Sequence, residues 1–482
     1  MAIRDRLAAL RRDVRGPAKA PAANAGGDSG PSSSADTAKV SVIVPVYNAM
    51  PYLTELLNSL EAQDLDASLF ELIAVDDGST DFSGEILDVY AARNTNFRVI
   101  HQENSGWPGK PRNVGMAASQ AKYVFFCDAD DRLGPQALRR MVDYANENNV
   151  DILVPKMVGI GGRRVQASLF ERTVKDVDLR EVLRSLSPQK MVRRELLVKN
   201  GITFHEDKVR LEDGMVMSQC YLLSQRTSIL ADYDYYFIRT REDGANISST
   251  PTIPEGYTWS VGEIARILTE GDKDSDRAKL LVLDLYRRKC LRVYEPQRFL
   301  KFSPEIQERW VAAHAEFVDR YIPEDIDIQL ATPFKQKTQF IRNRDVAGML
   351  EYCKLESSLQ PVARVTGMEL GAAVVTMEVA LEHGEMDAVD LLVRRRDGSA
   401  ERSFPMLRMD NEHANFRVDL PYSELDEFSS AIVDFFTEAS SKGMTGKLQR
   451  VTVDDQLDLP EQKDHRRPYA TIHGSLSLDL RR

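Results

Sequence analysis

The sequence has few cysteines and no long apolar run. Its four cysteines, Cys127, Cys220, Cys290 and Cys353, include no CxxC pair, which is typical of reduced thiols in a cytoplasmic protein. No apolar run approaches the roughly 18 residues that would cross a bilayer. The N-terminus also lacks the apolar core and small-residue cleavage site of a secretory signal. We therefore expect a cytoplasmic protein.

An excess of basic residues is missing as well. The chain has 63 Lys and Arg against 74 Asp and Glu, a net charge of -11. A general polyanion-binding surface is therefore not expected, and neither is a nucleic-acid partner, although a local basic site remains open. The apolar fraction of 43% is that of a globular protein, and 482 residues predict about three domains.

Residues 1–38 differ from the rest of the chain. Most of the charged residues in 1–20 are basic, and the apolar residues recur at helical spacing (Ile3, Leu7, Leu10 and Val14). This pattern predicts a short basic helix that would touch the anionic inner face of the plasma membrane. A frayed, solvated tail is the alternative. Residues 17–38 are rich in Ala, Gly, Ser and Pro, which indicates a flexible linker.

Residues 39–252 alternate apolar, strand-like runs with helical patterns. The expected strands are Val40–Val46, Glu71–Val75, Phe97–His101, Tyr123–Cys127 and Asp151–Val154. Such alternation predicts an α/β domain with a doubly wound, mostly parallel sheet.

The patterns change twice after this domain. Residues 253–358 are mainly helical, and residues 359–482 contain short strands with turn signals. Asp397-Gly398 predicts a hairpin turn between Val389–Arg396 and Ser399–Leu407. Strands at this spacing favour a C-terminal β-sandwich, which we interpret as an interaction or oligomerisation module.

Acidic clusters follow two of the expected strands. Asp76-Asp77-Gly78-Ser79 follows the second, and Asp128-Ala129-Asp130-Asp131 follows the fourth. The carboxyl ends of parallel strands form the ligand-binding edge of such a sheet. Asp128 and Asp130 are alternate residues and can share a site, where carboxylate oxygens suit Mg²⁺ or Mn²⁺ bridging a diphosphate. We expect Asp131 to shape the turn before the helix at Pro135.

Three further segments carry charged candidates. Glu212-Asp213 precedes an apolar helical run and predicts either a general base or a helix cap. Arg239 and Arg241 would neutralise a leaving diphosphate or pair with Glu242 and Asp243. The loop at 104–113 is rich in Gly and Pro and places Lys110 and Arg112 where they could meet a phosphate.

Together these motifs resemble a family 2 glycosyltransferase with the GT-A fold. The resemblance covers roughly residues 40–250 and includes Val42-Ile43-Val44-Pro45-Val46-Tyr47-Asn48. A narrower likeness is to wall teichoic acid poly(ribitol phosphate) N-acetylglucosaminyltransferases. It rests on the loop Asn104–Asn113, on Ser187-Pro188-x-Lys190, and on Arg241-Glu242 before Ser248-Ser249. The helical region and the β region resemble that group's trimerising extension in architecture.

The resemblance implies a GT-A mixed sheet and a UDP-sugar site. It implies Asp213 as the base with Glu212 beside it, and Asp130 as the Mn²⁺ or Mg²⁺ ligand. It further implies sugar transfer with inversion to a hydroxyl of a cell-wall or surface polymer by a homo-oligomer, such as a trimer. The donor-binding residues that it implies are Pro45, Tyr47, Asp77, Asn104, Arg112, Asp128, Arg239 and Arg241.

Two departures leave the donor and the acceptor open. Trp107 stands where those enzymes have a glycine, and Asn246 falls near a position where they have a phosphate-binding histidine. The transferred sugar would be N-acetylglucosamine or another hexose, and the acceptor a teichoic acid, another surface polysaccharide or a glycolipid. A non-catalytic module that binds sugar nucleotides or glycans is the alternative from another class, and the presence of Asp128, Asp130 and Asp213 disfavours it.

Overall fold

A computed structural model describes residues 38–244, 246, 250–382, 386–409, 414–428 and 430–481. The predicted basic helix in residues 1–20 and the Ser248-Ser249 pair lie outside these residues. Within the described residues, no helix is both long and apolar enough to cross a membrane.

The first domain is built on a mixed sheet. Its strands lie in the order β3 (Phe97–His101), β2 (Phe70–Asp76), β1 (Val40–Val46), β4 (Tyr123–Phe126), β8 (Met191–Arg193), β6 (Ile152–Pro155) and β9 (Thr227–Leu230). β1 pairs in parallel with both β2 and β4, whereas β8 is antiparallel to its neighbours. β1 is apolar along almost its whole length because helices cover both faces of the sheet. The predicted α/β domain is therefore confirmed, with one strand reversed.

A second, small sheet extends the edge where the strands of the first sheet end. β10 (Tyr236–Arg239) lies between β5 (Arg132–Leu133) and β7 (Met157–Ile160). This pairing brings Arg239 next to the acidic cluster that follows β4. The helices of the domain are α2 (Tyr52–Glu61), α3 (Ser83–Arg93), α4 (Gly109–Ala118), α5 (Ala137–Glu147), α6 (Leu179–Val182), α7 (Arg194–Lys199) and α8 (Glu212–Leu223).

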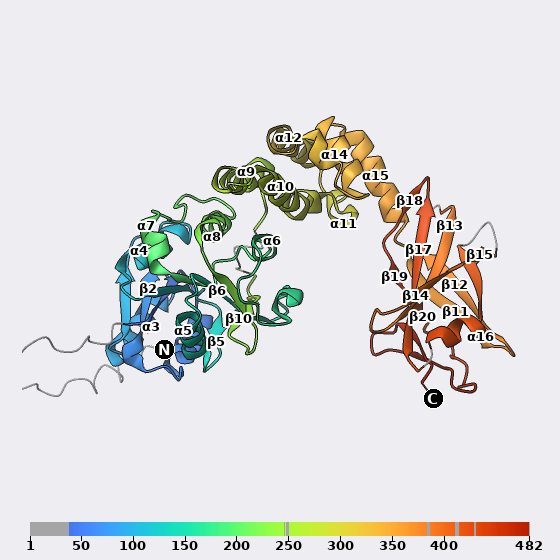
Figure 1. Cartoon of the computed structure of the whole chain (residues 1–482), viewed down its shortest axis with the longest axis horizontal. Coiled ribbons are helices and arrows are strands. Elements are labelled where there is room, and N and C mark those ends of the chain that lie inside the picture. The colour runs from blue at the N-terminus through green and yellow to red at the C-terminus, as the bar shows by residue number, and fades with distance from the viewer. Residues whose placement is uncertain are drawn as a thin grey trace, which may run out of the picture.

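Helices fill the chain from 254 to 358. They are α9 (Pro254–Gly271), α10 (Ser275–Lys289), α11 (Pro296–Phe299), α12 (Pro304–Tyr321), α13 (Glu324–Asp327), α14 (Phe334–Arg342) and α15 (Val346–Ser358). One continuous hydrophobic cluster runs from Val40 to Cys353, so these helices share the core of the first domain. In Figure 1 they lie between the first domain and the C-terminal strands.

α9 packs along α8 with the two helices running in the same direction. A Cβ added to Gly214 would lie 2.9 Å from Cδ1 of Ile264, and one added to Gly271 would lie 2.8 Å from Cδ1 of Leu222. The start of α8 therefore faces α9 just past its middle, and the end of α8 faces the last turn of α9. Glycine at 214 and 271 permits this close approach.

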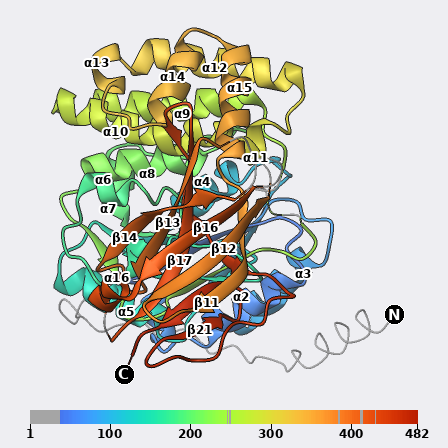
Figure 2. The same cartoon turned by 90° about the vertical axis from the view of Figure 1, so that its right-hand side faces the viewer.

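The C-terminal strands form two sheets around a separate core. One sheet has the order β15 (Leu407–Arg408), β16 (Asn415–Pro421), β12 (Val374–Glu382), β11 (Val362–Leu370) and β20 (Thr452–Val453). The other follows β14 (Glu401–Pro405), β13 (Ala388–Arg395), β17 (Ile432–Ser441), β22 (Leu476–Asp479) and β21 (Arg467–Ala470), with β18 (Met444–Thr445) and β19 (Gln449–Arg450) also paired to β17. Buried and more exposed residues alternate along β12 and β17, as in a sandwich. Figure 2 views these strands below the helices.

The hairpin predicted at Asp397-Gly398 is confirmed. β13 pairs antiparallel with β14, and Gly398 between them has a φ of 76°. The predicted β-sandwich is therefore present, and its strands follow the helical region directly.

The shared core predicts that α9 contributes to the stability of the first domain. We expect Ile264→Ala, which empties a fully buried position against Gly214, to lower the free energy of unfolding by about 2–5 kcal/mol. Ile253→Ala, at an exposed position just before α9, is the matched control and should change it by less than about 0.5 kcal/mol. Equal melting temperatures for the two variants would contradict the shared core.

Candidate active site

Arg112 on α4 joins two parts of the molecule that are distant in sequence. Its Nη2 lies 3.0 Å from Oδ1 of Asp128, after β4, and its Nη1 lies 3.2 Å from Oε1 of Glu212, the first residue of α8. The residue is only 5% exposed. Burial alone would lower the pKa of Arg112, but the charges of Asp128 and Glu212 raise it above its ordinary value.

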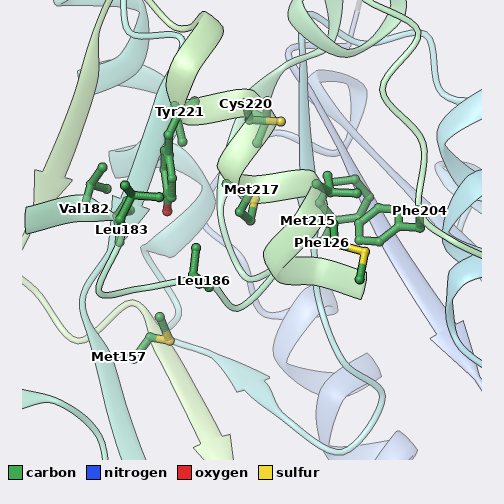
Figure 3. Packing of buried hydrophobic residues seen from close by; sticks show 14 of the residues in the cluster. Phe126, Met157, Val182, Leu183, Leu186, Phe204, Met215, Met217, Cys220 and Tyr221 are labelled. Carbon is green, nitrogen blue, oxygen red and sulfur yellow. The ribbon is translucent and has the colours of Figure 1, made fainter. Parts of the chain in front are cut away.

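Aromatic and sulfur side chains form the floor beneath this arginine. The Arg112 guanidinium lies 5.3 Å from the ring centre of Phe204, and Phe204 meets Phe126 edge to face with ring centres 5.1 Å apart. Figure 3 shows Phe126, Phe204 and Met215 packed together beside the first turn of α8. The floor is apolar, so the charges above it are poorly screened by water.

Asp128 has a second partner that the sequence did not identify. Gln189 donates from Nε2 to Oδ2 of Asp128 at 2.6 Å, and Gln189 is fully buried. This residue is the unspecified position within Ser187-Pro188-x-Lys190, so the motif located the segment but not the contact. Asp128 is thus held by Arg112 on one oxygen and by Gln189 on the other.

Glu212 and Asp213 begin α8, and both have a raised pKa. Burial and the neighbouring Asp213 charge raise the pKa of Glu212 to about 7, against the opposing effect of Arg112. Burial also raises the pKa of Asp213, and Arg112 and Lys289 oppose that shift. Leu211, just before them, has a φ of 60°, a conformation that costs about 1–2 kcal/mol for a residue with a side chain.

A buried lysine also lies near the base candidate. Lys190 is completely buried and donates from Nζ to the carbonyl of Ser187 at 2.6 Å and to its hydroxyl at 2.9 Å. Burial lowers the pKa of Lys190 to about 7, and the charge of Asp213 opposes that shift. Lys289 comes from α10, so the helical region reaches the surroundings of Asp213.

Asp130 and Asp131 have different surroundings. Asp131 accepts from the Tyr236 hydroxyl at 2.6 Å and from the Arg239 amide at 2.7 Å, which confirms its structural role in the turn. Burial and the charge of Asp128 raise the pKa of Asp130 to about 6, and its Oδ2 accepts from Nδ2 of Asn246 at 3.2 Å.

The surroundings of Asp130 fit a metal ion. A partly buried carboxylate beside a second carboxylate is stabilised by a cation, which removes the mutual repulsion. In the part of the chain that the structure describes, no three acidic, His or Cys side chains form a ready-made metal site. Mg²⁺ and Mn²⁺ commonly take only one or two protein carboxylates together with substrate phosphates and water, and a single carboxylate such as Asp130 fits that mode of binding; the metal itself stays a prediction.

The two arginines after β10 lie over one aromatic ring. The guanidinium carbons of Arg239 and Arg241 are 5.3 and 5.2 Å from the ring centre of Tyr52. Arg241 donates to the Asn48 carbonyl at 3.2 Å and pairs with Asp243 at 2.7 Å, which is one of the two alternatives that the sequence left open. Arg239 donates from Nε to the Asp130 carbonyl at 3.0 Å. Both arginines therefore lie near the acidic cluster.

The remaining donor-site candidates lie at the ends of β1 and β2. Asp77 is buried and accepts from the amide and hydroxyl of Ser105, whereas Asn104 donates to the Asp77 carbonyl at 2.8 Å. Asp77 therefore fixes the loop before α4. Pro45 lies near the end of β1, and Tyr47 directly follows this strand. Tyr47 is 51% exposed, so its aromatic ring is open to a ligand. Their roles toward a nucleotide stay predictions.

Comparison with known proteins places this site in a family. The Glycosyl transferase family 2 model matches residues 41–210, and the Glycosyl transferase TarS linker domain model matches residues 254–353. The crystal structure of S. aureus TarS 1–349 in complex with UDP-GlcNAc is 30% identical, with a TM-score of 0.61, over 72% of this chain and 97% of that one. The chain belongs to the family 2 glycosyltransferases.

Two further comparisons extend this result. A poly(ribitol-phosphate) beta-glucosyltransferase of Bacillus spizizenii is 33% identical over 344 residues, which are 70% of this chain and 54% of that relative. The glycosyltransferase described here thus spans about half the length of that protein. The crystal structure of S. aureus TarS, 24% identical with a TM-score of 0.63, covers 92% of this chain and 85% of its own. It shows the same fold, a GT-A-like domain followed by helices and a β-rich region.

The contacts of Arg112 predict that its loss destabilises this glycosyltransferase strongly. Arg112→Met would leave the carboxylates of Asp128 and Glu212 without their cation, at a cost of about 3–5 kcal/mol in the free energy of unfolding. Arg139→Met, which breaks an exposed pair with Asp64, is the control and should cost less than about 1 kcal/mol. Denaturant unfolding of both variants checks this, and similar values would show that Arg112 does not hold the site together.

Proposed function

We propose that this glycosyltransferase moves a hexose from a UDP-sugar to a hydroxyl of a polyol-phosphate polymer, with inversion at the anomeric carbon. The observation that carries the proposal is the placement of Asp213 beside Arg112, which also holds Asp128 of the acidic turn. A base candidate on one side of a diphosphate-type site is the arrangement that single-displacement sugar transfer requires.

Asp213 would act as the general base. Its carboxylate takes the proton of the acceptor hydroxyl while that oxygen forms a bond to the anomeric carbon. The bond from this carbon to the diphosphate oxygen breaks at the same time, and its electron pair leaves with UDP. Burial raises the pKa of Asp213 and makes it a stronger base, whereas Arg112 and Lys289 favour its ionised form. As the pH is lowered, Asp213 should therefore take up a proton, and turnover should begin to fall, at a higher pH than for an aspartate with an ordinary pKa.

The departing diphosphate would be stabilised by the opposite side of the site. Arg241 lies next to Asp130 and would meet the charge that develops on the leaving group. A Mn²⁺ or Mg²⁺ ion held by Asp130 would add Lewis-acid stabilisation of the same oxygens. Tyr52 lies beneath both Arg239 and Arg241 and helps to fix their position.

The names of the related proteins suggest the donor. One relative is a glucosyltransferase, and the related TarS fragment was solved with UDP-GlcNAc. We propose UDP-glucose or UDP-N-acetylglucosamine as the donor. Trp107 is buried beside Glu212 and lowers its pKa, so this side chain would form one wall near the transferred sugar.

Local positive charge supports an anionic acceptor. Arg210, Arg292 and Arg298 surround Tyr257 closely enough to affect its pKa, and Lys289 lies near Asp213. Most of these residues come from the helical region, and Lys289 supplies positive charge near Asp213 although the whole chain has a net charge of -11. We propose that this positive charge helps to bind a phosphate-containing polymer. The homotrimer, the membrane contact of the tail and the cytoplasmic location stay predictions.

Replacement of the base should separate binding from turnover. We expect Asp213→Asn to lower the rate of sugar transfer to poly(ribitol phosphate) by about 10²–10⁴-fold, because the acceptor proton loses its base. UDP affinity, measured by calorimetry, should stay within about twofold of the wild type, because Asp213 does not contact the nucleotide in this mechanism. Wild-type transfer by this variant would remove Asp213 from the mechanism.

Replacement of the proposed metal ligand should instead change the affinity for UDP. Asp130→Ala is expected to abolish the increase in UDP affinity that Mn²⁺ produces, since the ion would lose its protein ligand. Calorimetric titration of UDP with and without Mn²⁺ measures this increase directly. Asp131→Asn, next to it in the chain, is the control for local structure, and an unchanged Mn²⁺ effect in Asp130→Ala would assign the ion elsewhere.

A further inference from the structure

His101, the last residue of β3, lies between two carboxylates. Its Nδ1 is 2.9 Å from Oδ2 of Asp76, at the end of β2, and its Nε2 is 3.0 Å from Oδ1 of Asp88 on α3. A neutral imidazole carries one N–H, so it can donate to just one of the two carboxylates and turns a lone pair toward the other. The cationic ring carries two N–H groups and satisfies both. The geometry therefore favours the charged form of His101.

Helix α3 packs closely against this ion pair. A Cβ added to Gly84 would lie 2.9 Å from Oδ2 of Asp76 and 3.7 Å from Cε1 of His101. The charged groups that act on the ring are Asp76 from β2 and Asp88 from α3. Hydrogen bonds to these two carboxylates raise the pKa of His101 above its ordinary value, against the smaller opposing effect of burial.

The other oxygen of Asp76 holds the turn that follows β2. Oδ1 of Asp76 accepts from the Ser79 amide at 3.0 Å, and the Ser79 hydroxyl accepts from the Asn48 amide at 3.1 Å. The Asn48 carbonyl in turn accepts from Nη2 of Arg241 at 3.2 Å. A continuous series of contacts therefore connects His101 with the arginine that we place at the leaving diphosphate.

The residue after His101 holds the second aspartate of the turn. Gln102 donates from its backbone amide to the Asp76 carbonyl at 2.9 Å and from Nε2 to Oδ1 of Asp77. Asp77 is the buried donor-site candidate that also fixes the loop before α4. His101 and Gln102 thus fix neighbouring aspartates from the same strand end.

We propose that the cationic His101 is a positioning residue for the UDP-sugar, acting through Asp76. This inference rests on the proposed function. When the ring loses its proton, one carboxylate loses its donor, and the turn that carries Asp77 is held less firmly. The Asn48 contact of Arg241 depends on the same turn. Donor affinity should then depend on the charge of a side chain that does not itself touch the donor.

The direction of the pH dependence follows from the raised pKa of His101. The contribution of the charged ring is complete below pH 6.5, the ordinary pKa of histidine, and it is lost as the pH rises through the higher pKa of the folded protein. The side chain is 48% exposed, so solvent screening keeps the effect modest.

Calorimetric binding of UDP-glucose across this pH range tests the proposal. UDP-glucose lacks the terminal phosphate of UDP, which would itself titrate near about pH 6. Wild-type affinity at about pH 6 should exceed that of His101→Gln by about three- to fivefold, and the two should converge by about pH 9. Asp130 and Glu212 titrate in both proteins, so the ratio of the affinities isolates His101.

A ratio of one at every pH would overturn the proposal, and so would a loss of affinity that stays constant with pH, which is the result of a purely structural role. Failure of the wild type to bind either UDP-glucose or UDP-N-acetylglucosamine would instead contradict the proposed function.

Asp88→Asn provides a second variant that leaves the contact between His101 and Asp76 in place. It removes one of the two charges that raise the pKa of His101. Affinity at about pH 6 should stay within about twofold of the wild type, whereas the fall in affinity should begin at a lower pH. An unchanged midpoint would contradict the proposal. His465→Gln, which removes a histidine 3.5 Å from Asp426 in the C-terminal region, is the matched control and should change neither quantity.

Discussion

The buried bridge from Asp128 through Arg112 to Glu212 is the interaction on which the site depends. It connects Asp128, in the acidic turn after β4, with Glu212, the first residue of α8, 84 residues later in the chain. The guanidinium is almost completely buried above the apolar floor of Phe126 and Phe204, so water screens its charge poorly. Since Asp213 follows Glu212 directly, the position of the base candidate is set by the same bridge.

The helical region belongs to the site as well as to the core. α9 lies along α8 from Gly214 to Leu222, and the hydrophobic cluster continues into these helices without a break. α10 adds Lys289 near Asp213. If the helical region only separated the two domains, neither the packing of α9 on α8 nor the position of Lys289 near Asp213 would be needed. The β-sandwich, by contrast, has its own core and holds none of the candidate site residues.

Much of this arrangement could be predicted from the sequence. The apolar run Val40–Val46 and the acids after β2 and β4 predicted a sheet edge with carboxylates, and the turn role of Asp131 followed from its place before a helix. Gln189 and Lys289 could not be found in this way. Their contacts with the site depend on the reversed strand β8 and on the packing of α10, which no local pattern specifies. Arg112 itself was a candidate from the sequence, but its two partners could not be predicted, because they lie 16 and 100 residues away.

The most direct test of the bridge is a double-mutant cycle between Asp128→Asn and Glu212→Gln, measured as kcat for sugar transfer. The two side chains touch the same guanidinium, so we expect their effects on kcat not to be additive, with a coupling free energy of at least about 1 kcal/mol. In an Arg112→Met background the coupling should disappear. Additive effects within about 0.5 kcal/mol in the wild-type background would contradict the claim that Arg112 links the acidic turn to the base helix.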